Sequence, residues 1–536
     1  MKKLILALST LLVLSSSVQA QYAEEKPEIL WGKEFKASKR STLEDIVGYD
    51  ESGIYAINSK IVNFITGKKK YTLQRFDRNM NLAQSVEFEQ EHQGHDLDYE
   101  FILHLNQRLF LFTSSTDRNK NLKALYTQEL NKKTLVPIST PNKIAETEYT
   151  FLTKSNTGNF NWEISSDSSK VLIYYNLAHK LSKTEKYALQ VLDNELRLLW
   201  KTEVNIPHGE DVFTVRDYLV DPFGEVHILG RLYKEKQKEK RNGEPNYNYQ
   251  ILSYTNNGTD FEQYTVDLEG KFLTEMKIAV NDHQDIICGG FYSSKGTTSI
   301  DGSYFLKIDG QSKEIVSQEF EEFSLDFITE NLSARQEKKA KKKAAKGKNL
   351  EMFQYDLRKI ILNENGGAVL IGEQFFIHTS IVYTSTANGG GSTTTNYQYY
   401  YNSIIVINMS AEGKIEWTKS IPKRQVTSND NGFFSSFALS VVGDKLYFVY
   451  NDNPKNLLPP EKKGDIYAMS GSRKKRGVTL ATLSLNGDLK RESLVSAGEV
   501  EIYIRPKTCE QISQNELIIF GQRKKKQRFA KVTFKP

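Results

Sequence analysis

The sequence predicts an all-β fold in which one antiparallel module is repeated many times. A strand–turn–strand unit recurs eight times along the chain, and nearly every copy is followed by a second hairpin. The last copy is one strand short at the C-terminus, and a spare strand precedes the first copy. At 536 residues, the chain also exceeds a single layered core, which stops growing near ~250–300 residues. A repeat avoids that limit because it adds modules without thickening one core.

The first hairpin of each module has an apolar strand, a short polar turn and a second strand that often ends in Gly. In the first five copies the turns lie 56 to 62 residues apart, near Asp50, Asn106, Ser168, Gly224 and His283. Alternation bounded by turn residues is the signature of a strand pair. The eight copies are Ile46–Lys60, Ile102–Ser114, Glu163–Asn176, Tyr218–Leu232, Ile278–Tyr292, Ile360–Phe375, Ala438–Asp452 and Glu510–Gln522.

The second hairpin alternates aromatic and β-branched residues and is complete in seven modules. These seven run Tyr71–Phe88, Ala124–Thr140, Tyr187–Pro207, Tyr249–Leu268, Tyr304–Phe320, Ser403–Pro422 and Val478–Ser496. The eighth has only Phe529–Phe534. Its missing strand is matched by Ile29–Lys36, in which Trp31 aligns with Trp200 and Trp417 of the other closing strands.

Four strands per module, closed by a strand from the opposite terminus, describe a single β-propeller. Radial repetition leaves only short, protected sheet edges. We therefore expect residues 21–536 to form about eight four-stranded blades, with the N-terminal strand 29–36 completing the C-terminal blade. Seven blades is the alternative, if one weak copy is mispaired.

Three insertions interrupt the late modules. Ile328–Met352 is rich in Ala, Lys and Glu and lacks Pro, which favours a short, exposed, charged helix. Thr384–Tyr401 is a Gly/Thr-rich segment that ends in tyrosines, and we expect a loop there. Asn453–Gly477 contains paired prolines and a basic run. Long loops on a rigid scaffold often carry function.

Residues 1–20 have the features of a secretory signal peptide. Lys2 and Lys3 form a positive start, Leu4–Leu14 is largely apolar, and Val18-Gln19-Ala20 fits a cleavage site. The apolar stretch is shorter than the ~20 residues that span a bilayer. We expect an exported protein that begins at Gln21, without a transmembrane segment, in the periplasm, at the cell surface or in the medium.

The closing strands resemble those of the quinoprotein-like, eight-bladed propellers, which often carry a Gly-x-x-x-Trp element. Gly413–Trp417 has that spacing, and Trp31 and Trp200 hold the same place without the glycine. That group includes quinone-dependent dehydrogenases and non-catalytic envelope scaffolds. The adjacent cysteine pair of the dehydrogenases is missing here, because Cys288 and Cys509 fall in separate modules. We expect two free thiols and no quinone cofactor.

The charge of the chain argues against a nucleic-acid partner. The net charge is +6, and removing Lys2 and Lys3 leaves 70 basic against 66 acidic residues, or about +4. This excess is too small and dispersed for a nucleic-acid-binding surface. Local basic runs would either be solvated or contact an anionic envelope surface. They are Lys234–Arg241, Lys338–Lys348, Arg473–Arg476 and Arg523–Lys526.

No motif of nucleophilic, phosphate-binding or zinc-protease chemistry occurs in the sequence. The densest set of ligand-type residues is His92, His95, Asp96 and Asp98. Imidazole and carboxylate groups at this spacing could bind a divalent metal such as zinc. The alternative is a hydrophilic connector between the first two modules. We otherwise expect no cofactor.

These observations favour a non-catalytic binding or assembly module of the cell envelope, with an envelope protein or surface glycan as its partner. Aromatic and basic side chains are the candidate contact residues, since such residues often anchor interfaces. They are Tyr397, Tyr399, Tyr400, Tyr401, Lys341, Lys342 and Lys343. The alternative is a secreted carbohydrate-active hydrolase or lyase that uses carboxylates of the propeller channel.

Overall fold

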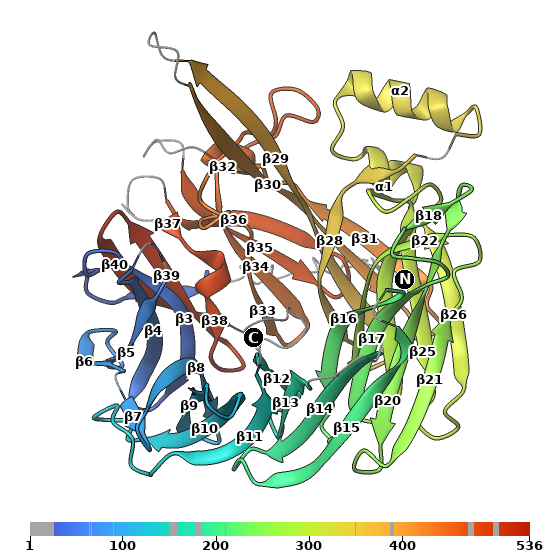
Figure 1. The fold of residues 1–536 in the computed structure, drawn as a ribbon. Helices are drawn as coiled ribbons and strands as arrows, with labels where there is room; N and C mark the ends of the chain where they lie inside the picture. The colour runs from blue at the N-terminus through green and yellow to red at the C-terminus, as the bar shows by residue number, and fades with distance from the viewer. Residues whose placement is uncertain are drawn as a thin grey trace, which may run out of the picture.

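Eight antiparallel sheets of four main strands are arranged around a ring in the computed structural model (Figure 1). The structure describes residues 26–535, except for 64, 66, 89, 150–157, 178–183, 210, 349, 386–390, 470–475 and 497–502. The protein is therefore an eight-bladed β-propeller over the described residues. The signal peptide expected at residues 1–20 lies outside them.

The first four blades follow the predicted modules in chain order. Blade 1 contains β3 (Ser41–Asp50), β4 (Gly53–Ile61), β5 (Lys69–Phe76) and β6 (Leu82–Glu87). Blade 2 contains β8 (His95–Leu105), β9 (Arg108–Asp117), β10 (Leu122–Leu130) and β11 (Asn142–Glu148), with β7 (Gln90–His92) beside β8. Blade 3 contains β12 (Phe160–Ile164), β13 (Lys170–Asn176), β14 (Thr184–Asp193) and β15 (Leu198–Gly209). Blade 4 contains β16 (Phe213–Val220), β17 (Val226–Tyr233), β20 (Tyr247–Thr255) and β21 (Asp260–Val266).

The last four blades carry the insertions. Blade 5 contains β22 (Phe272–Val280), β23 (Ile286–Ser293), β25 (Gly302–Ile308) and β26 (Ile315–Glu322). Blade 6 contains β28 (Tyr355–Leu362), β29 (Ala368–Ser385), β30 (Gly391–Met409) and β31 (Ile415–Ile421), with β32 (Gln425–Ser428) beside β30. Blade 7 contains β33 (Ala438–Val442), β34 (Lys445–Asp452), β35 (Gly477–Ser484) and β36 (Leu489–Val495). Short ladders outside the blades pair β18 (Lys240–Arg241) with β19 (Glu244–Pro245), and β24 (Ser299–Ile300) with β27 (Met352–Phe353).

Blade 8 is completed by the N-terminal strand, as predicted. Its C-terminal strands are β37 (Tyr503–Ile504), β38 (Glu510–Gln511), β39 (Glu516–Arg523) and β40 (Lys526–Thr533). The outer edge of β40 pairs with β1 (Glu28–Trp31), from Glu28 opposite Thr533 to Trp31 opposite Ala530, and then with β2 (Phe35–Lys36). The two ends of the chain thus close the ring through backbone hydrogen bonds.

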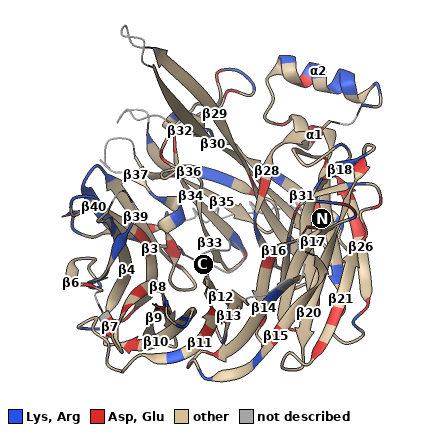
Figure 2. Ribbon diagram, viewed as in Figure 1, with Lys and Arg blue, Asp and Glu red and all other residues tan. Residues whose placement is uncertain are grey.

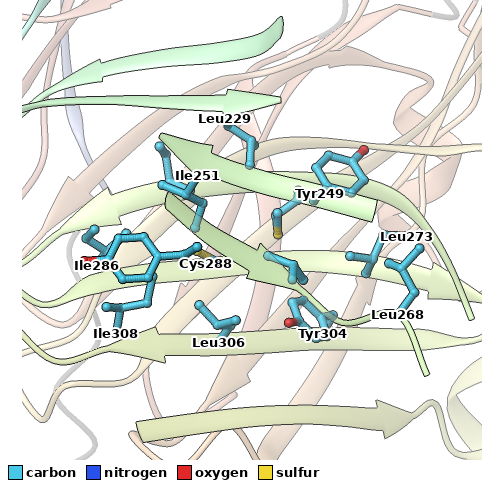
Figure 3. Close-up of a cluster of buried hydrophobic side chains, with 14 of the residues drawn as sticks. Leu229, Tyr249, Ile251, Leu268, Leu273, Ile286, Cys288, Tyr304, Leu306 and Ile308 are labelled. Carbon is cyan, nitrogen blue, oxygen red and sulfur yellow. The ribbon is translucent and has the colours of Figure 1, made fainter. Parts of the chain in front are cut away.

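The hydrophobic core lies between the blades. Figure 3 shows the cluster between blades 4 and 5, where Leu229 and Ile251 face Cys288 and Leu306. Neighbouring blades cover both faces of a middle strand. Strand β23 of blade 5 is accordingly buried at every residue. This explains why the second strand of each module is an almost continuous apolar run.

Two of the aligned tryptophan side chains donate a hydrogen bond to a neighbouring blade, each to a carbonyl in a different turn. The indole of Trp200 donates to the Gly224 carbonyl of blade 4 at 2.9 Å. The indole of Trp417 donates to the Leu485 carbonyl of blade 7 at 2.8 Å. A Trp with a satisfied N–H combines a large buried area with a fixed direction, which accounts for its recurrence in the closing strands.

The Ile328–Met352 insertion contains the expected helix. Helix α1 (Leu325–Thr329) is followed by α2 (Ala334–Ala344), which starts with a capping box between Ser333 and Gln336. The Asn453–Gly477 insertion contains the short 3₁₀ helix η1 (Pro454–Leu457), and η3 (Pro506–Thr508) precedes β38. No helix in the described part of the chain is long and apolar enough to cross a membrane.

Two local expectations were wrong. The hairpin expected at Ala124–Thr140 ends after β10, and the outer strand is β11, beyond Thr140. In the connection between them, Leu135 is fully buried and packs beside Leu130. The loop expected at Thr384–Tyr401 is mostly strand, because β29 and β30 continue their pairing out to Ser385 and Gly391. Its Thr and Tyr residues favour strands.

Candidate binding surface and first strands of the ring

The first strands of neighbouring blades contact one another around the middle of the ring (Figure 1). Five of them contain a β-bulge that leaves one residue without a cross-strand partner. A bulge redirects side chains and is common beside functional sites. The unpaired residues are Glu44 and Val47 on β3, then Glu100, Arg216, Thr274 and Arg358 on the other four strands, and four of the six are ionisable. Side chains at these bulges contact neighbouring strands: Glu100 accepts from the Ser114 hydroxyl, and Arg358 donates to Glu373 at 3.0 Å.

Two carboxyl groups lie together on the inner strands of blades 3 and 4. Burial raises the pKa of Glu163 to about 7, and the negative charge of Asp217 adds to that shift. Asp217 itself is paired with Lys277, whose ammonium lies 3.3 Å from its carboxylate. Near pH 7 the Glu163 carboxyl is therefore about half protonated, and it lies near a second carboxyl group, the kind of pair that acid–base catalysis uses.

Further carboxyl groups of the first strands also have raised pKa values. Burial, with the charge of Asp45 next, raises the pKa of Glu510 to about 6. Burial also raises the pKa of Asp45, and burial followed by the charge of Asp356 raises that of Glu275. Sequence motifs did not single these residues out. The signal that could have found them is an ionisable residue at the same place in successive first strands.

A buried ion pair lies where blade 6 meets blade 7. The Lys423 ammonium is 2.6 Å from Glu373, and both side chains are fully buried. The other Glu373 oxygen accepts from Arg358 at 3.0 Å and from the Ser436 hydroxyl at 2.7 Å. Burial lowers the pKa of Lys423, and the carboxylate of Glu373 opposes that shift. This network ties β28, β29 and the segment after β31 together.

Beyond this network, β29 and β30 leave the body of the propeller as a projecting hairpin, here called the arm (Phe375–Ser385 with Gly391–Tyr401) (Figure 1). No Lys, Arg, Asp or Glu occurs between Gln374 and Ala411, although 26% of the chain is charged. Figure 2 accordingly shows the arm without acidic or basic residues. An uncharged projection of this length on a well-charged surface suits contact with another molecule.

One face of the arm exposes apolar and aromatic side chains. Residues 377, 379, 381 and 383 share a face by strand alternation, and Tyr397 joins them opposite Thr379. Ile381 is 70% exposed and Tyr383 is 67% exposed. One edge is covered where β32 pairs with Gln398–Tyr401. On the other edge, β28 reaches only to Gln374, and no described strand pairs with β29 beyond it.

The four candidate tyrosines occupy different environments on β30. Tyr397 is 43% exposed, whereas Tyr399 is largely buried and donates to Asn431 at 2.7 Å. Tyr400 stacks on Phe376, with ring centroids 4.5 Å apart. Tyr401 is buried, and its hydroxyl accepts from the Lys507 ammonium at 2.7 Å. Only Tyr397 thus belongs to the open face, while the other three support the base of the arm.

A polar cleft of about 870 Å³ opens beside the base of the arm. Its walls come from the helical insertion, from blade 6 and from the Asn453–Gly477 insertion, and include Phe327, Tyr355, Arg424 and Tyr467. The three candidate lysines belong to the same helical insertion, but they lie on the exposed surface of α2. Lys341 pairs there with Glu337 at 2.8 Å, and Lys342 and Lys343 are exposed.

The candidate metal residues of the second module lie on a small hairpin. His92 is opposite His95, and Glu91 is opposite Asp96. Strand alternation therefore puts Asp96 and Asp98 on the face away from the two imidazoles. The His92 ring packs against Tyr126, 5.2 Å between centroids. The hairpin brings the two histidines together and separates them from the two aspartates.

Both cysteines are free thiols, as predicted. Burial raises the pKa of Cys288, which packs between blades 4 and 5 (Figure 3). Burial also raises the pKa of Cys509 to about 12, and its thiol donates to the Arg505 carbonyl at 3.3 Å. A thiol with a raised pKa is a poor nucleophile, so neither cysteine is a candidate catalytic group.

The basic runs are spread over separate surfaces. Lys234–Arg241 leads from β17 into β18, and Arg523–Lys526 turns from β39 into β40. In the third run, residues 473–475 lie outside the described residues, and Arg476 is buried against the Tyr503 ring at 4.5 Å. The described runs thus do not form one continuous basic surface.

Comparison with known proteins gives no family for this chain. No protein-family model and no curated protein matches it. Among solved structures, the WD40 domain of SCAP from fission yeast is 8% identical, covering 95% of this chain and 98% of that chain with a TM-score of 0.39. A Synechocystis apocarotenoid oxygenase mutant is 8% identical over 90% and 94% of the two chains, with a TM-score of 0.34. Prolyl oligopeptidase B from Galerina marginata is 8% identical over 90% and 55%, with a TM-score of 0.36. The chain is a β-propeller by its own eight sheets.

Proposed function

We propose that this chain is exported by residues 1–20 and acts as a non-catalytic binding or assembly module of the cell envelope, with the arm as its contact surface. The observation that carries the proposal is the uncharged arm, which exposes Ile381, Tyr383 and Tyr397 on one face. Exposed apolar surface of this kind marks interaction sites. The propeller would serve as the rigid support.

The base of the arm is suited to hold that surface in a fixed direction. The buried Glu373–Lys423 pair and the contacts of Tyr399 and Tyr401 all lie where the arm leaves blade 6. A pre-ordered surface loses less conformational entropy on binding. The aromatic side chains of the arm would therefore bind without first becoming ordered.

An envelope protein with an extended segment fits the arm better than a glycan does. The edge of β29 beyond Gln374 has no partner strand among the described residues. Such an edge can accept a strand from another chain through backbone hydrogen bonds. Native proteins usually protect such edges with charges or proline, and this edge has neither from Phe375 to Ser385.

Affinity capture with matched arm variants tests this proposal. Residues 21–536 would be presented to the organism's own envelope extract after mild cross-linking. The variant Ile381→Lys plus Tyr383→Lys places two charges on the apolar face, whereas Ser392→Lys plus Thr394→Lys places the same charges on the opposite face. We expect a reproducible partner that is lost only with the first variant. If both variants captured the partner equally well and had equal melting temperatures, the arm would not be part of the contact surface.

A secreted hydrolase or lyase acting on carbohydrate is the second candidate, and Glu163 favours it. Its carboxyl, with a pKa of about 7, lies near Asp217, which pairs with Lys277. Glycoside chemistry uses two such carboxyl groups. A glycan panel assayed with the wild type and Glu163→Gln tests it: turnover that disappears in the variant supports this function, and no turnover on any glycan rejects it for that panel.

A further inference from the structure

Three ligand-type side chains gather at the turn between β16 and β17, away from the arm. One oxygen or nitrogen atom from each of Asp221, Glu225 and His227 lies within 4.8 Å of the other two. Asp221 is 1% exposed and His227 is 2% exposed, while Glu225 is half-buried. Among the described residues they form the one group of three such side chains close enough to share a metal ion.

Two buried atoms of this group have no hydrogen-bond partner. Asp221 Oδ1 accepts from the backbone N–H groups of Phe223 at 2.9 Å and Glu225 at 2.8 Å, but Oδ2 accepts none. Oδ2 instead faces His227 Nε2 at 3.6 Å, which is also unpartnered. A buried polar atom without a partner costs about 1–3 kcal/mol, so a missing binding partner is expected here.

Other contacts hold both side chains in position for a common ligand. Nδ1 of His227 lies 2.9 Å from the Ser253 hydroxyl, which fixes the ring and leaves Nε2 directed at Asp221. The two backbone N–H groups on Asp221 Oδ1 fix the carboxylate in the same way. Metal-binding histidines and carboxylates are usually oriented by such outer hydrogen bonds.

The equivalent turn of blade 5 shows how the propeller satisfies this position without an ion. Asn281 accepts from the N–H groups of His283 and Asp285, as Asp221 does in blade 4. Its side-chain amide then donates to Asp285 at 3.0 Å, and Lys307 pairs with the same carboxylate at 2.8 Å. The two turns can be aligned on the first residues of β17 and β23. In this alignment the counterparts of Asp221, Glu225 and His227 are Asn281, Asp285 and Ile287.

In blade 4 the amide donor is replaced by a carboxylate and the apolar residue by an imidazole. Asp221 thus presents an oxygen to Glu225 where Asn281 presents an N–H group to Asp285. No Lys or Arg of the described residues forms an ion pair with Asp221 or Glu225, whereas Lys307 pairs with Asp285 in blade 5. The turn of blade 4 thus brings two carboxyl groups and an imidazole together without the amine that blade 5 supplies.

We propose that Asp221, Glu225 and His227 bind a divalent metal cation through Asp221 Oδ2, the Glu225 carboxylate and His227 Nε2. An imidazole ligand favours zinc over calcium or magnesium, which prefer oxygen ligands. The +2 charge balances the two carboxylates. A cation bound there braces the β16–β17 turn against β20, because the His227 ring also contacts Ser253.

Calorimetric titration of zinc into chelator-stripped residues 21–536 tests this site. The repeat itself supplies two substitutions that blade 5 already contains at these positions: Asp221→Asn and His227→Ile. We expect one saturable zinc site in the wild type and a loss of affinity of about 100-fold or more in each variant. Magnesium and calcium should not compete at equal concentration.

Melting temperatures measured without and with zinc distinguish a metal site from a direct contact between Asp221 and His227 that needs no metal. Zinc should raise the melting temperature of the wild type but not that of Asp221→Asn. Without zinc, Asp221→Asn should melt higher than the wild type, because the new amide donates to Glu225. The control variant His92→Ala plus His95→Ala should keep the zinc site. The proposal is overturned if the wild type takes up no zinc, or if uptake survives in Asp221→Asn and disappears in the control variant.

Discussion

At the scale of single residues, the buried pair of Glu373 and Lys423 is the contact whose loss should matter most for stability. Removing one member leaves the other as an uncompensated buried charge, which costs about 3–5 kcal/mol. We therefore expect Glu373→Gln to lower the free energy of unfolding by that amount in chemical denaturation. Glu34→Gln, which breaks a half-exposed pair with Lys526, should cost about 0–1 kcal/mol. Equal losses in the two variants would contradict the role given to burial.

The raised pKa of Glu163 predicts a pH dependence of stability. Its pKa is about 7 in the folded chain and near 4.5 when unperturbed. Between these values the folded state holds the proton more tightly than the unfolded state, so this group makes stability fall as pH rises. Glu163→Gln should flatten the decline of melting temperature between about pH 4.5 and pH 7. An unchanged profile would mean that the Glu163 carboxyl ionises in the folded chain as it does in solvent.

At the scale of elements, the arm should be dispensable for folding. Thr379 and Tyr397 are directly opposite each other, so the residues between them can be replaced by an Asn-Gly turn, which suits a two-residue hairpin. We expect the shortened chain to keep its melting temperature within a few degrees, because the removed side chains are mostly exposed. Circular dichroism melts check this. A large loss of stability would show that the arm packs on the propeller instead of projecting from it.

The elements that the sequence predicted are those specified by local residues. Each first hairpin, with its two alternating strands and its polar turn, lies within about twenty residues. All eight could therefore be located from the sequence. The bulges at Glu44, Arg216 and Arg358 depend on the pairing register between strands, which alternation alone does not specify. The Glu373–Lys423 contact joins residues 50 positions apart, and neither residue belongs to a motif. The sequence therefore predicted the blades but not the network between them.

At the scale of the whole molecule, the ring depends on one short non-covalent closure. Strand β1 has four residues, and with β2 it supplies the outer partner of β40 in the last blade. In a repeat protein each module is stabilised mainly by its neighbours. Opening the ring at this strand would therefore expose the sides of blade 8 and blade 1 together, and the closure should limit the stability of the whole propeller.

A disulfide across that closure tests this idea. Glu28 and Thr533 are directly opposite each other on β1 and β40, and opposite residues of an antiparallel pair have Cα atoms about 4.5–5.5 Å apart, within the range a disulfide can bridge. The double variant Glu28→Cys plus Thr533→Cys closes a loop of almost the entire chain. Chain entropy then predicts a stabilisation of up to about 5 kcal/mol, measured as a higher melting temperature that a reducing agent abolishes. Each single variant should melt like the wild type. If the double variant cross-links without any rise in melting temperature, unfolding starts elsewhere in the ring, and the terminal strand is not its weakest point.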